Sequence, residues 1–180
     1  FSQVRTWDAI IYHYLNDHNI VIPQKKNLDK GNQYAGAYVK EPIPGMYEWV
    51  ASFDLDSLYP HLIMQYNISP ETLLTQYPQK SLSVSKLLDR DIETDYAKDE
   101  NICMGANGFH FSNEFQGFLP NMMERMYAER KKFKKDMLKT SQLLENEKEE
   151  GERFRLIKEV SRLNNMQMAR KIQLNSAYGA

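Results

Sequence analysis

The sequence predicts an α+β protein, with a small mixed body followed by a long antiparallel helical hairpin. Short runs rich in β-branched and aromatic residues alternate with turn residues up to about residue 117. Apolar residues then recur at helical spacing over most of the remaining chain. A polar break at residues 146–151 divides this stretch into two long helices. Long helices joined by a short connection pack side by side in opposite directions.

The first part of the chain is predicted to contain a helix, a loop and a strand. Residues 6–18 predict an amphipathic helix with apolar residues at helical spacing: Trp7, Ile10, Ile11, Tyr14 and Leu15. Residues 23–46 hold three prolines and three glycines, so we expect a loop with short extended pieces. Residues 47–53 are rich in aromatic and β-branched types and predict a strand that ends at Asp54.

Two short helices and an irregular segment are predicted next. Pro60 predicts a helix at about residues 60–66, because the first turn of a helix tolerates proline. Ser69-Pro70 is a similar start signal and predicts a short helix near residues 70–76. Residues 78–100 show little pattern and include acidic clusters, so we expect an irregular segment.

The remaining elements are a β-hairpin and the helical hairpin. Asn107-Gly108 lies between residues 102–104 and 109–111, which is typical of a tight β-hairpin. The first long helix is predicted from residue 119, and the second from about 152 to 178.

Composition restricts the class of protein. The hydrophobic fraction of 42% and the charged fraction of 26% are typical of globular domains and exclude an intrinsically disordered chain. No apolar run approaches the roughly 20 residues that span a bilayer, so no membrane association is expected. The single Cys103 excludes a disulfide within the chain and a cysteine-based zinc site. The chain opens without Met and without a signal-peptide pattern, so we expect a piece of a longer protein that is not secreted.

Charge is distributed unevenly along the sequence. Residues 119–171 contain fourteen basic and nine acidic residues, although the whole chain has a formal net charge of −1. This excess of positive charge indicates a possible contact with a polyanion in the C-terminal third. The alternative is that the basic helices are simply solvated.

The segment Asp54-Leu55-Asp56-Ser57-Leu58-Tyr59-Pro60 carries the strongest local chemical pattern. A carboxylate at the end of a strand can bind Mg²⁺, which uses one or two carboxylates together with phosphate oxygens. The helix start that follows can attract phosphate through its backbone N–H groups. Together these features suit phosphoryl transfer. The alternative is an ordinary turn that contains aspartate.

Two sets of polar residues lie on single faces of the predicted long helices. Arg130 and Lys134 are four residues apart on the first helix, and Lys171, Asn175 and Tyr178 follow one face of the second. If the helices pair, Arg130, Lys134 and Lys171 can converge on one polyphosphate. The alternative is two solvated faces whose charges are balanced by nearby carboxylates: Glu129, Asp136 and Glu159.

These motifs resemble those of family B DNA polymerases. Residues 54–60 resemble the first polymerase motif, Asp-x-x-Ser-Leu-Tyr-Pro, and residues 171–179 resemble the second, Lys-x-x-x-Asn-Ser-x-Tyr-Gly. Tyr34-Ala35-Gly36-Ala37 is similar to an element that separates the exonuclease and polymerase domains. The amino-acid sequences at residues 6–11, 39–44 and 67–72 are similar to those of T-even-type tailed-phage replicative polymerases. Residues 78–116 and 138–165 match poorly.

The resemblance implies a domain organisation. Residues 1–30 would be a connecting helix and linker from the exonuclease side. Residues 31–117 would form a partial palm, a β-sheet with short helices, that contains the first motif. Residues 118–180 would form the fingers, a helical hairpin that contains the second motif.

The resemblance also implies roles for the first motif. Asp54 would bind both of two catalytic Mg²⁺ ions and the Leu55 carbonyl would bind one, while a second carboxylate ligand would lie outside this chain. Backbone N–H groups of Ser57, Leu58 and Tyr59 would hold the triphosphate. The Tyr59 ring would crowd the 2′ position of the incoming sugar and so reject ribonucleotides.

Roles for the helical hairpin follow in the same way. Arg130, Lys134 and Lys171 would hold the β- and γ-phosphates, with Asn175 in support and Lys171 counted with Asp54 as catalytic. Four residues would border the nascent base pair or touch the template strand: Tyr34, Gly36, Tyr178 and Gly179. The implied reaction is DNA-directed DNA synthesis, the attack of a primer 3′-hydroxyl on the α-phosphate of a dNTP. Primer–template DNA and dNTPs would be its substrates.

The sequence departs from the family pattern in three places. Asp56 replaces a neutral residue, and His61 stands where Ser is common. The chain ends before the third motif, Asp-Thr-Asp, so we expect it to be inactive alone and active within its full-length parent. The parent would contact a sliding clamp and other replisome proteins through regions outside this chain, in the cytoplasm of an infected bacterium.

Two other classes of function remain open at this point. The chain could be a non-catalytic nucleic-acid-binding or scaffold module that uses its basic helical hairpin. It could also be a purely structural helical domain that binds a partner.

Overall fold

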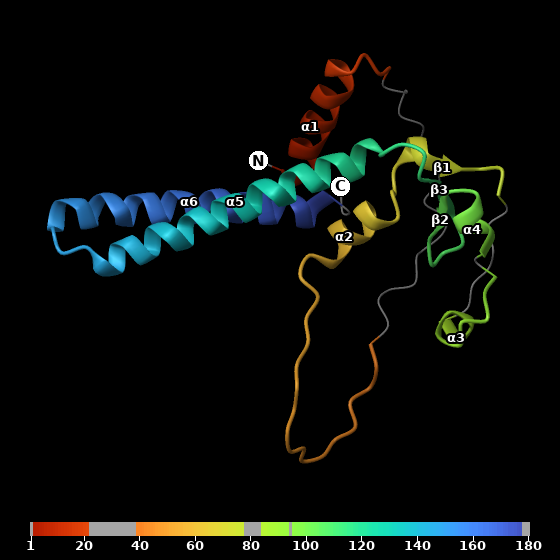
Figure 1. The fold of residues 1–180 in the computed structure, drawn as a ribbon, viewed down its shortest axis with the longest axis horizontal. Helices are drawn as coiled ribbons and strands as arrows, with labels where there is room; N and C mark the ends of the chain where they lie inside the picture. Colours follow the sequence, from red (N-terminus) through yellow and green to blue (C-terminus); the bar gives the residue numbers. More distant parts are fainter. Residues whose placement is uncertain (1, 22–38, 78–83, 94, 178–180) are drawn as a thin grey trace. The chain divides into compact units, whose positions relative to one another are not determined.

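The chain, whose fold is drawn in Figure 1, divides into two units. One unit contains Phe1–Trp7 and Ser57–Ala180, and the other contains Asp8–Asp56. The computed structural model describes residues 2–21, 39–77, 84–93 and 95–177. The mixed composition of helices and a small antiparallel sheet confirms the predicted α+β class.

Helix α1 (Gln3–Asp17) confirms the predicted N-terminal helix and begins three residues earlier than expected. It ends because Asn19 adopts a left-handed conformation with φ of 55°. The Ile20 N–H then donates to the Leu15 carbonyl at 2.8 Å, the six-to-one bond that closes a helix C-terminus.

The strand predicted at residues 47–53 is wrong. Trp49 has φ of 62°, which interrupts an extended backbone, and none of the described residues pairs with this segment. The side chains of Trp49 and Phe53 are 99% and 94% exposed. Composition favours a strand here, but a strand forms only where a neighbouring strand supplies hydrogen bonds.

The body of the larger unit begins with helix α2 (Leu58–Gln65), which confirms the helix predicted after residue 60 and starts two residues earlier. The second predicted helix, at residues 70–76, is wrong beyond its first turn. Only a 3-10 turn, η1 (Pro70–Thr72), is formed, and strand β1 (Leu73–Leu74) follows it. Leu73 is extended because it pairs with Phe111 in the sheet.

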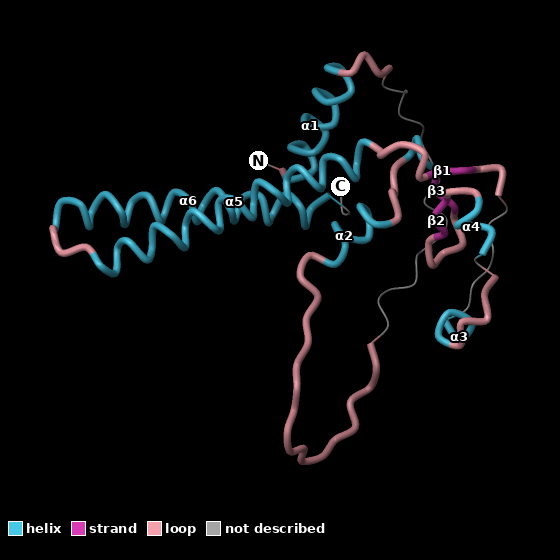
Figure 2. The backbone as a smooth tube through the Cα atoms, viewed as in Figure 1, coloured by secondary structure: helices cyan, strands magenta, loops and turns pink. Residues whose placement is uncertain are grey.

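The sheet has three antiparallel strands in the order β1-β3-β2 (Figure 2). Strands β2 (Ile102–Met104) and β3 (His110–Ser112) confirm the predicted hairpin, with Cys103 opposite Phe111. Gly108 has φ of 80°, which glycine adopts without steric cost in the connecting turn. The pairing of β1 with β3 was not predicted.

The segment expected to be irregular contains two short helices, α3 (Val84–Leu88) and α4 (Asp95–Asp99). Helix α4 packs against β2, and the Tyr96 hydroxyl is 2.7 Å from Nε2 of the buried His110 on β3. A tertiary contact therefore stabilises a helix whose own sequence shows little helical pattern.

Helices α5 (Phe118–Asn146) and α6 (Glu150–Ser176) form the predicted antiparallel hairpin and lie side by side (Figure 1). Its interior contains five buried apolar side chains: Met122, Met123, Met126, Leu163 and Leu174. No described helix combines the length and the apolar character that crossing a membrane requires.

Candidate functional site

The N-terminus of α2 is attached to α5 by a hydrogen bond between side chains. Ser57 precedes α2 in a left-handed conformation, with φ of 54° and ψ of 47°. Its hydroxyl does not cap α2 but accepts a hydrogen bond from Nη1 of Arg130 at 3.0 Å. An arginine of the helical hairpin therefore lies at the start of the first motif's helix.

A second contact joins the same two helices. Nδ1 of His61 lies 2.9 Å from the Ser57 carbonyl oxygen, and its ring meets the Tyr127 ring edge-to-face at 4.7 Å between centroids. Tyr127 lies one helical turn before Arg130, so both contacts fall on one face of α5. His61, which stands where Ser is common in the family pattern, therefore helps to hold α2 on α5.

The start of α5 is held by the segment that follows α2. Three successive backbone N–H groups donate to its side chains: Gly117 to Asn67 Oδ1 at 2.9 Å, Phe118 to Glu71 Oε1 at 2.5 Å, and Leu119 to Ser69 Oγ at 3.4 Å. The first N–H groups of a helix have no partners within it, and a carboxylate there also interacts favourably with the helix dipole. A Cβ at Gly117 would lie 2.5 Å from Cβ of Ser69, so this close approach requires glycine.

Glu129 of α5 and Arg170 of α6 lie at the same level of the hairpin and form an ion pair, with Oε2 and Nη2 separated by 2.7 Å. The next residue on each helix, Arg130 or Lys171, is turned by about 100°. Because the helices run in opposite directions, both rotations lead toward the same flank of the pair. One turn further along, each helix presents another polar residue there. We call this set the basic flank: Arg130, Lys134, Lys171 and Asn175.

The residues of the basic flank and of the first turn of α2 differ in exposure. Arg130 is half-buried, whereas Lys134, Lys171 and Asn175 are exposed. Leu58 and Tyr59, the first two residues of α2, are 41% and 51% exposed. The ammonium groups of Lys134 and Lys171 can therefore be reached by an anion in solution.

Asp54 and Leu55 belong to the unit Asp8–Asp56 and lie in a segment without regular secondary structure. Both side chains are exposed, and Asp54 does not end a strand as expected. Among the described residues, no group of three histidine, cysteine, aspartate or glutamate side chains could hold a metal ion. Four predicted site residues lie outside the described residues: Tyr34, Gly36, Tyr178 and Gly179.

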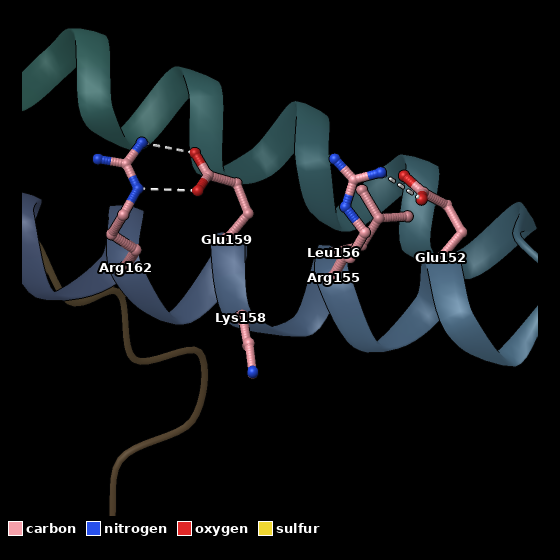
Figure 3. Close-up of a pocket in the computed structure, with 6 residues that line it drawn as sticks. All are labelled: Glu152, Arg155, Leu156, Lys158, Glu159 and Arg162. Carbon is pink, nitrogen blue, oxygen red and sulfur yellow. Dashed lines mark hydrogen bonds and ion pairs between the residues drawn. The ribbon is translucent and has the colours of Figure 1, made fainter.

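A depression on α6 contains none of the predicted site residues (Figure 3). It is lined by Glu152, Arg155, Leu156, Lys158, Glu159 and Arg162. Two ion pairs border it, Arg155 with Glu152 at 3.0 Å and Arg162 with Glu159 at 2.6 Å, while Lys158 points away from α5. Hydrogen bonding from Arg162 lowers the pKa of Glu159. Both carboxylates and both guanidinium groups that line the depression are therefore already paired.

Comparison with known proteins decides the family. Residues 2–180 match DNA polymerase family B. The chain belongs to DNA polymerase family B. It is 38% identical to the DNA-directed DNA polymerase of Escherichia phage RB69 over 138 residues, which cover 77% of this chain and 15% of the phage protein. It is 35% identical to the DNA-directed DNA polymerase of Enterobacteria phage T4 over 136 residues, which cover 76% of the chain and 14% of that protein.

Similarity extends to cellular members of family B. The chain is 35% identical to the DNA polymerase delta catalytic subunit of Candida albicans over 162 residues, covering 89% of the chain and 13% of that subunit. This family B chain thus spans only a small part of the length of its relatives. The predicted resemblance to family B, including its T-even phage type, is confirmed.

The sequence did not predict the residues that support this site in the family B chain. The start of α5 is held by Asn67, Ser69 and Glu71. The last turn of α6 is contacted by Trp7 from α1 and by Arg170 from within α6. Asn67, just beyond the end of α2, did carry a usable signal in the sequence, because asparagine tolerates the left-handed conformation found at helix ends. The pairing of Arg170 with Glu129 carries no local signal.

Proposed function

We propose that this chain carries the nucleotide-binding part of a DNA-directed DNA polymerase that adds dNTPs to a primer 3′-hydroxyl. In this proposal residues 1–30 form a connecting helix and linker from the exonuclease side. Residues 31–117 form part of the palm, and residues 118–180 form the fingers. The observation that carries the proposal is the hydrogen bond from Arg130 to Ser57. It joins a cation of the helical hairpin to the start of the first motif's helix, where phosphate binding is favoured.

The chain's own residues would bind and orient the triphosphate. Backbone N–H groups of residues 57–59 would hold phosphate oxygens at the N-terminus of α2. Arg130 would offer a planar fork, and Lys134 and Lys171 would add point charges from the same flank. Asn175 is one turn beyond Lys171 and would support it. These interactions favour in-line attack because they fix the α-phosphate against the primer hydroxyl.

The residues near the first motif suit magnesium. Asp54 and Asp56 are exposed carboxylates two residues apart, and Mg²⁺ is bound by one or two carboxylates together with phosphate oxygens. Asp54 would hold two ions and the Leu55 carbonyl one of them, with a second carboxylate supplied from outside this chain. When bound, the ions would stabilise charge on the entering and leaving oxygens.

The remaining partners belong to the full-length polymerase. Four residues would line the path of the template and the nascent base pair: Tyr34, Gly36, Tyr178 and Gly179. A sliding clamp and other replisome proteins would bind regions outside this chain. We place the enzyme in the cytoplasm of an infected bacterial host, because its sequence resembles those of T-even-type phage polymerases.

Steady-state incorporation by the full-length polymerase tests the proposal. Arg130→Ala and Lys171→Ala should each raise the KM for dNTP by about ten- to a hundred-fold, because each removes a hydrogen bond to a charged phosphate. Lys148→Ala, in the turn between α5 and α6, is the matched control and should leave the KM unchanged. An unchanged KM in both site variants would contradict the proposal, as would Mg²⁺-dependent extension that persists in Asp54→Ala.

One observation favours the alternative, a non-catalytic module that docks on nucleic acid. Four exposed lysines share one side of α5: Lys131, Lys132, Lys135 and Lys139. Within the described part of the chain, none of them forms an ion pair with a carboxylate. We call this set the outer lysine face.

A further inference from the structure

Trp7 is a buried N-terminal side chain that contacts the end of α6. It is 1% exposed and is among the largest fully buried side chains of the described residues. Its indole Nε1–H donates to the Gln173 carbonyl at 3.0 Å and to Ser176 Oγ at 3.1 Å. The Ser176 hydroxyl donates to the same Gln173 carbonyl at 3.0 Å. These three polar groups therefore form one closed set.

The acceptor of this bond is a backbone carbonyl in the last turn of α6. Helix α6 ends at Ser176, and Ala177 follows it with helical dihedral angles of φ −60° and ψ −36°, so the Gln173 carbonyl lies in the last turn, where the hydrogen-bond ladder of the helix ends. Leu174, directly after it, is 1% exposed, so one face of this turn is buried. Trp7 thus acts as a C-terminal cap for α6 from a position 166 residues earlier in the sequence.

The same turn of α6 is linked to α5 through side chains. Gln173 Oε1 accepts a hydrogen bond from Arg170 Nη1 at 2.6 Å. Nη2 of that arginine lies 2.7 Å from Glu129 Oε2 on α5. Glu129 directly precedes Arg130, and Arg170 directly precedes Lys171. The chain of contacts therefore runs from α1 through α6 to α5 at the level of the basic flank.

We propose that Trp7 is a positioning residue for the nucleotide-binding flank. By holding the last turn of α6, it sets the height and rotation of that helix, and thereby the position of Lys171 and Asn175 relative to Arg130. Trp7 itself does not touch the substrate. The inference rests on the proposed function, since it assigns Trp7 a role in binding the same dNTP.

Single-nucleotide incorporation by the full-length polymerase tests this role. Trp7→Phe keeps most of the ring volume and removes the N–H donor. We expect the KM for dNTP to rise about three- to ten-fold, the value of one hydrogen bond, while the Kd for primer–template changes by less than about two-fold. A purely structural role would instead reduce the fraction of active enzyme, which lowers the apparent kcat and leaves the KM unchanged.

Three further variants complete the design. Tyr12→Phe, on the same helix and 55% exposed, is the matched control and should leave the KM unchanged. Arg170→Gln breaks the network at a partly exposed side chain without opening the core, so it tests the inference even if Trp7→Phe folds poorly. It should raise the KM in the same direction. Arg130→Ala reports on the proposed function itself.

The outcomes separate the two proposals. If Arg130→Ala raises the KM but neither Trp7→Phe nor Arg170→Gln does, the positioning role is overturned and the proposed function stands. If Arg130→Ala also leaves the KM unchanged, the proposed function fails first. A raised KM in Trp7→Phe and Arg170→Gln, with unchanged DNA affinity, supports the positioning role.

Discussion

At the scale of single residues, Asn67 links three parts of the larger unit. It has φ of 51° and is 6% exposed. Its Nδ2 donates to the carbonyls of Ser112 at 2.6 Å and Phe115 at 2.8 Å, while Oδ1 accepts from the N–H of Gly117. One side chain therefore joins the end of α2 to the end of β3 and the start of α5. Asparagine suits this position because it tolerates a left-handed backbone and can both donate and accept.

Replacing Asn67 should loosen the start of α5. Asn67→Ala removes three hydrogen bonds and should lower the local free energy of opening by about 2–4 kcal/mol, measured by hydrogen exchange at the Phe118 amide. Asn67→Gly also loses the bonds but keeps the left-handed backbone, so it should be milder by about 1 kcal/mol. Asn165→Ala, on the exposed face of α6, is the control. Unchanged exchange at Phe118 in Asn67→Ala would show that the bonds do not hold α5.

Tyr59 gives a second prediction at this scale. Its ring is half exposed in the first turn of α2, two residues after the Ser57 that contacts Arg130. If the triphosphate binds there, the ring lies close to the sugar. In the full-length polymerase, Tyr59→Ala should therefore lose discrimination against ribonucleotides, whereas Tyr59→Phe should retain it. The measurement is the ratio of kcat/KM for dNTP and rNTP, and an unchanged ratio in Tyr59→Ala would be evidence against this position for the sugar.

At the scale of elements, the turn between α5 and α6 is organised by two side chains. Nη1 of Arg153 donates to the carbonyls of Leu144 at 3.0 Å and Glu147 at 2.7 Å, and so satisfies carbonyls at the end of α5. The Glu147 carboxylate accepts from the N–H groups of Lys148 and Glu149 at 2.8 and 3.0 Å. A three-residue connection can therefore reverse the chain between two long helices.

This turn should respond to pH in a defined direction. Backbone hydrogen bonds from Glu149 and Lys148 lower the pKa of Glu147. The ionised carboxylate therefore stabilises the turn above the ordinary glutamate pKa of about 4.3, and this contribution is lost as pH falls through the lowered value. Amide chemical shifts of Lys148 and Glu149 should titrate with a midpoint below the ordinary value. Glu147→Gln should abolish this titration, and a midpoint at or above the ordinary value would contradict the assignment.

At the scale of the whole molecule, positive charge is separated into two surfaces of the helical hairpin. The basic flank faces the side on which Arg130 meets α2, and the outer lysine face lies on another side of α5. The first would bind a nucleotide, and the second would matter only if the hairpin docked on nucleic acid.

Neutralising the outer lysine face distinguishes these possibilities. A full-length variant with Lys131, Lys132, Lys135 and Lys139 all replaced by Gln should keep its KM for dNTP. The slope of log affinity for primer–template against log salt should change by less than about 1, because these lysines would contact no phosphates. A slope reduced by about 3 or more, with the KM unchanged, would instead favour the docking role.

Features that depend only on residues close together in the sequence could be predicted from the sequence alone. The Asn107-Gly108 turn and the apolar spacing of α5 and α6 are local patterns that the structure confirms. The family resemblance, which rested on two local motifs, is confirmed by the comparisons. A local pattern restricts the backbone to a few conformations and marks its apolar face, so no knowledge of distant segments is needed.

Only the tertiary structure decided the pairing of segments that are far apart. Residues 47–53 have strand composition but no described pairing partner, whereas Leu73 becomes extended because β3 lies beside it. The contacts of Trp7 with α6 and of Arg130 with Ser57 also join distant positions. Hydrogen bonds of this kind form only after the chain has folded, because each donor meets its acceptor through packing and not through sequence neighbourhood.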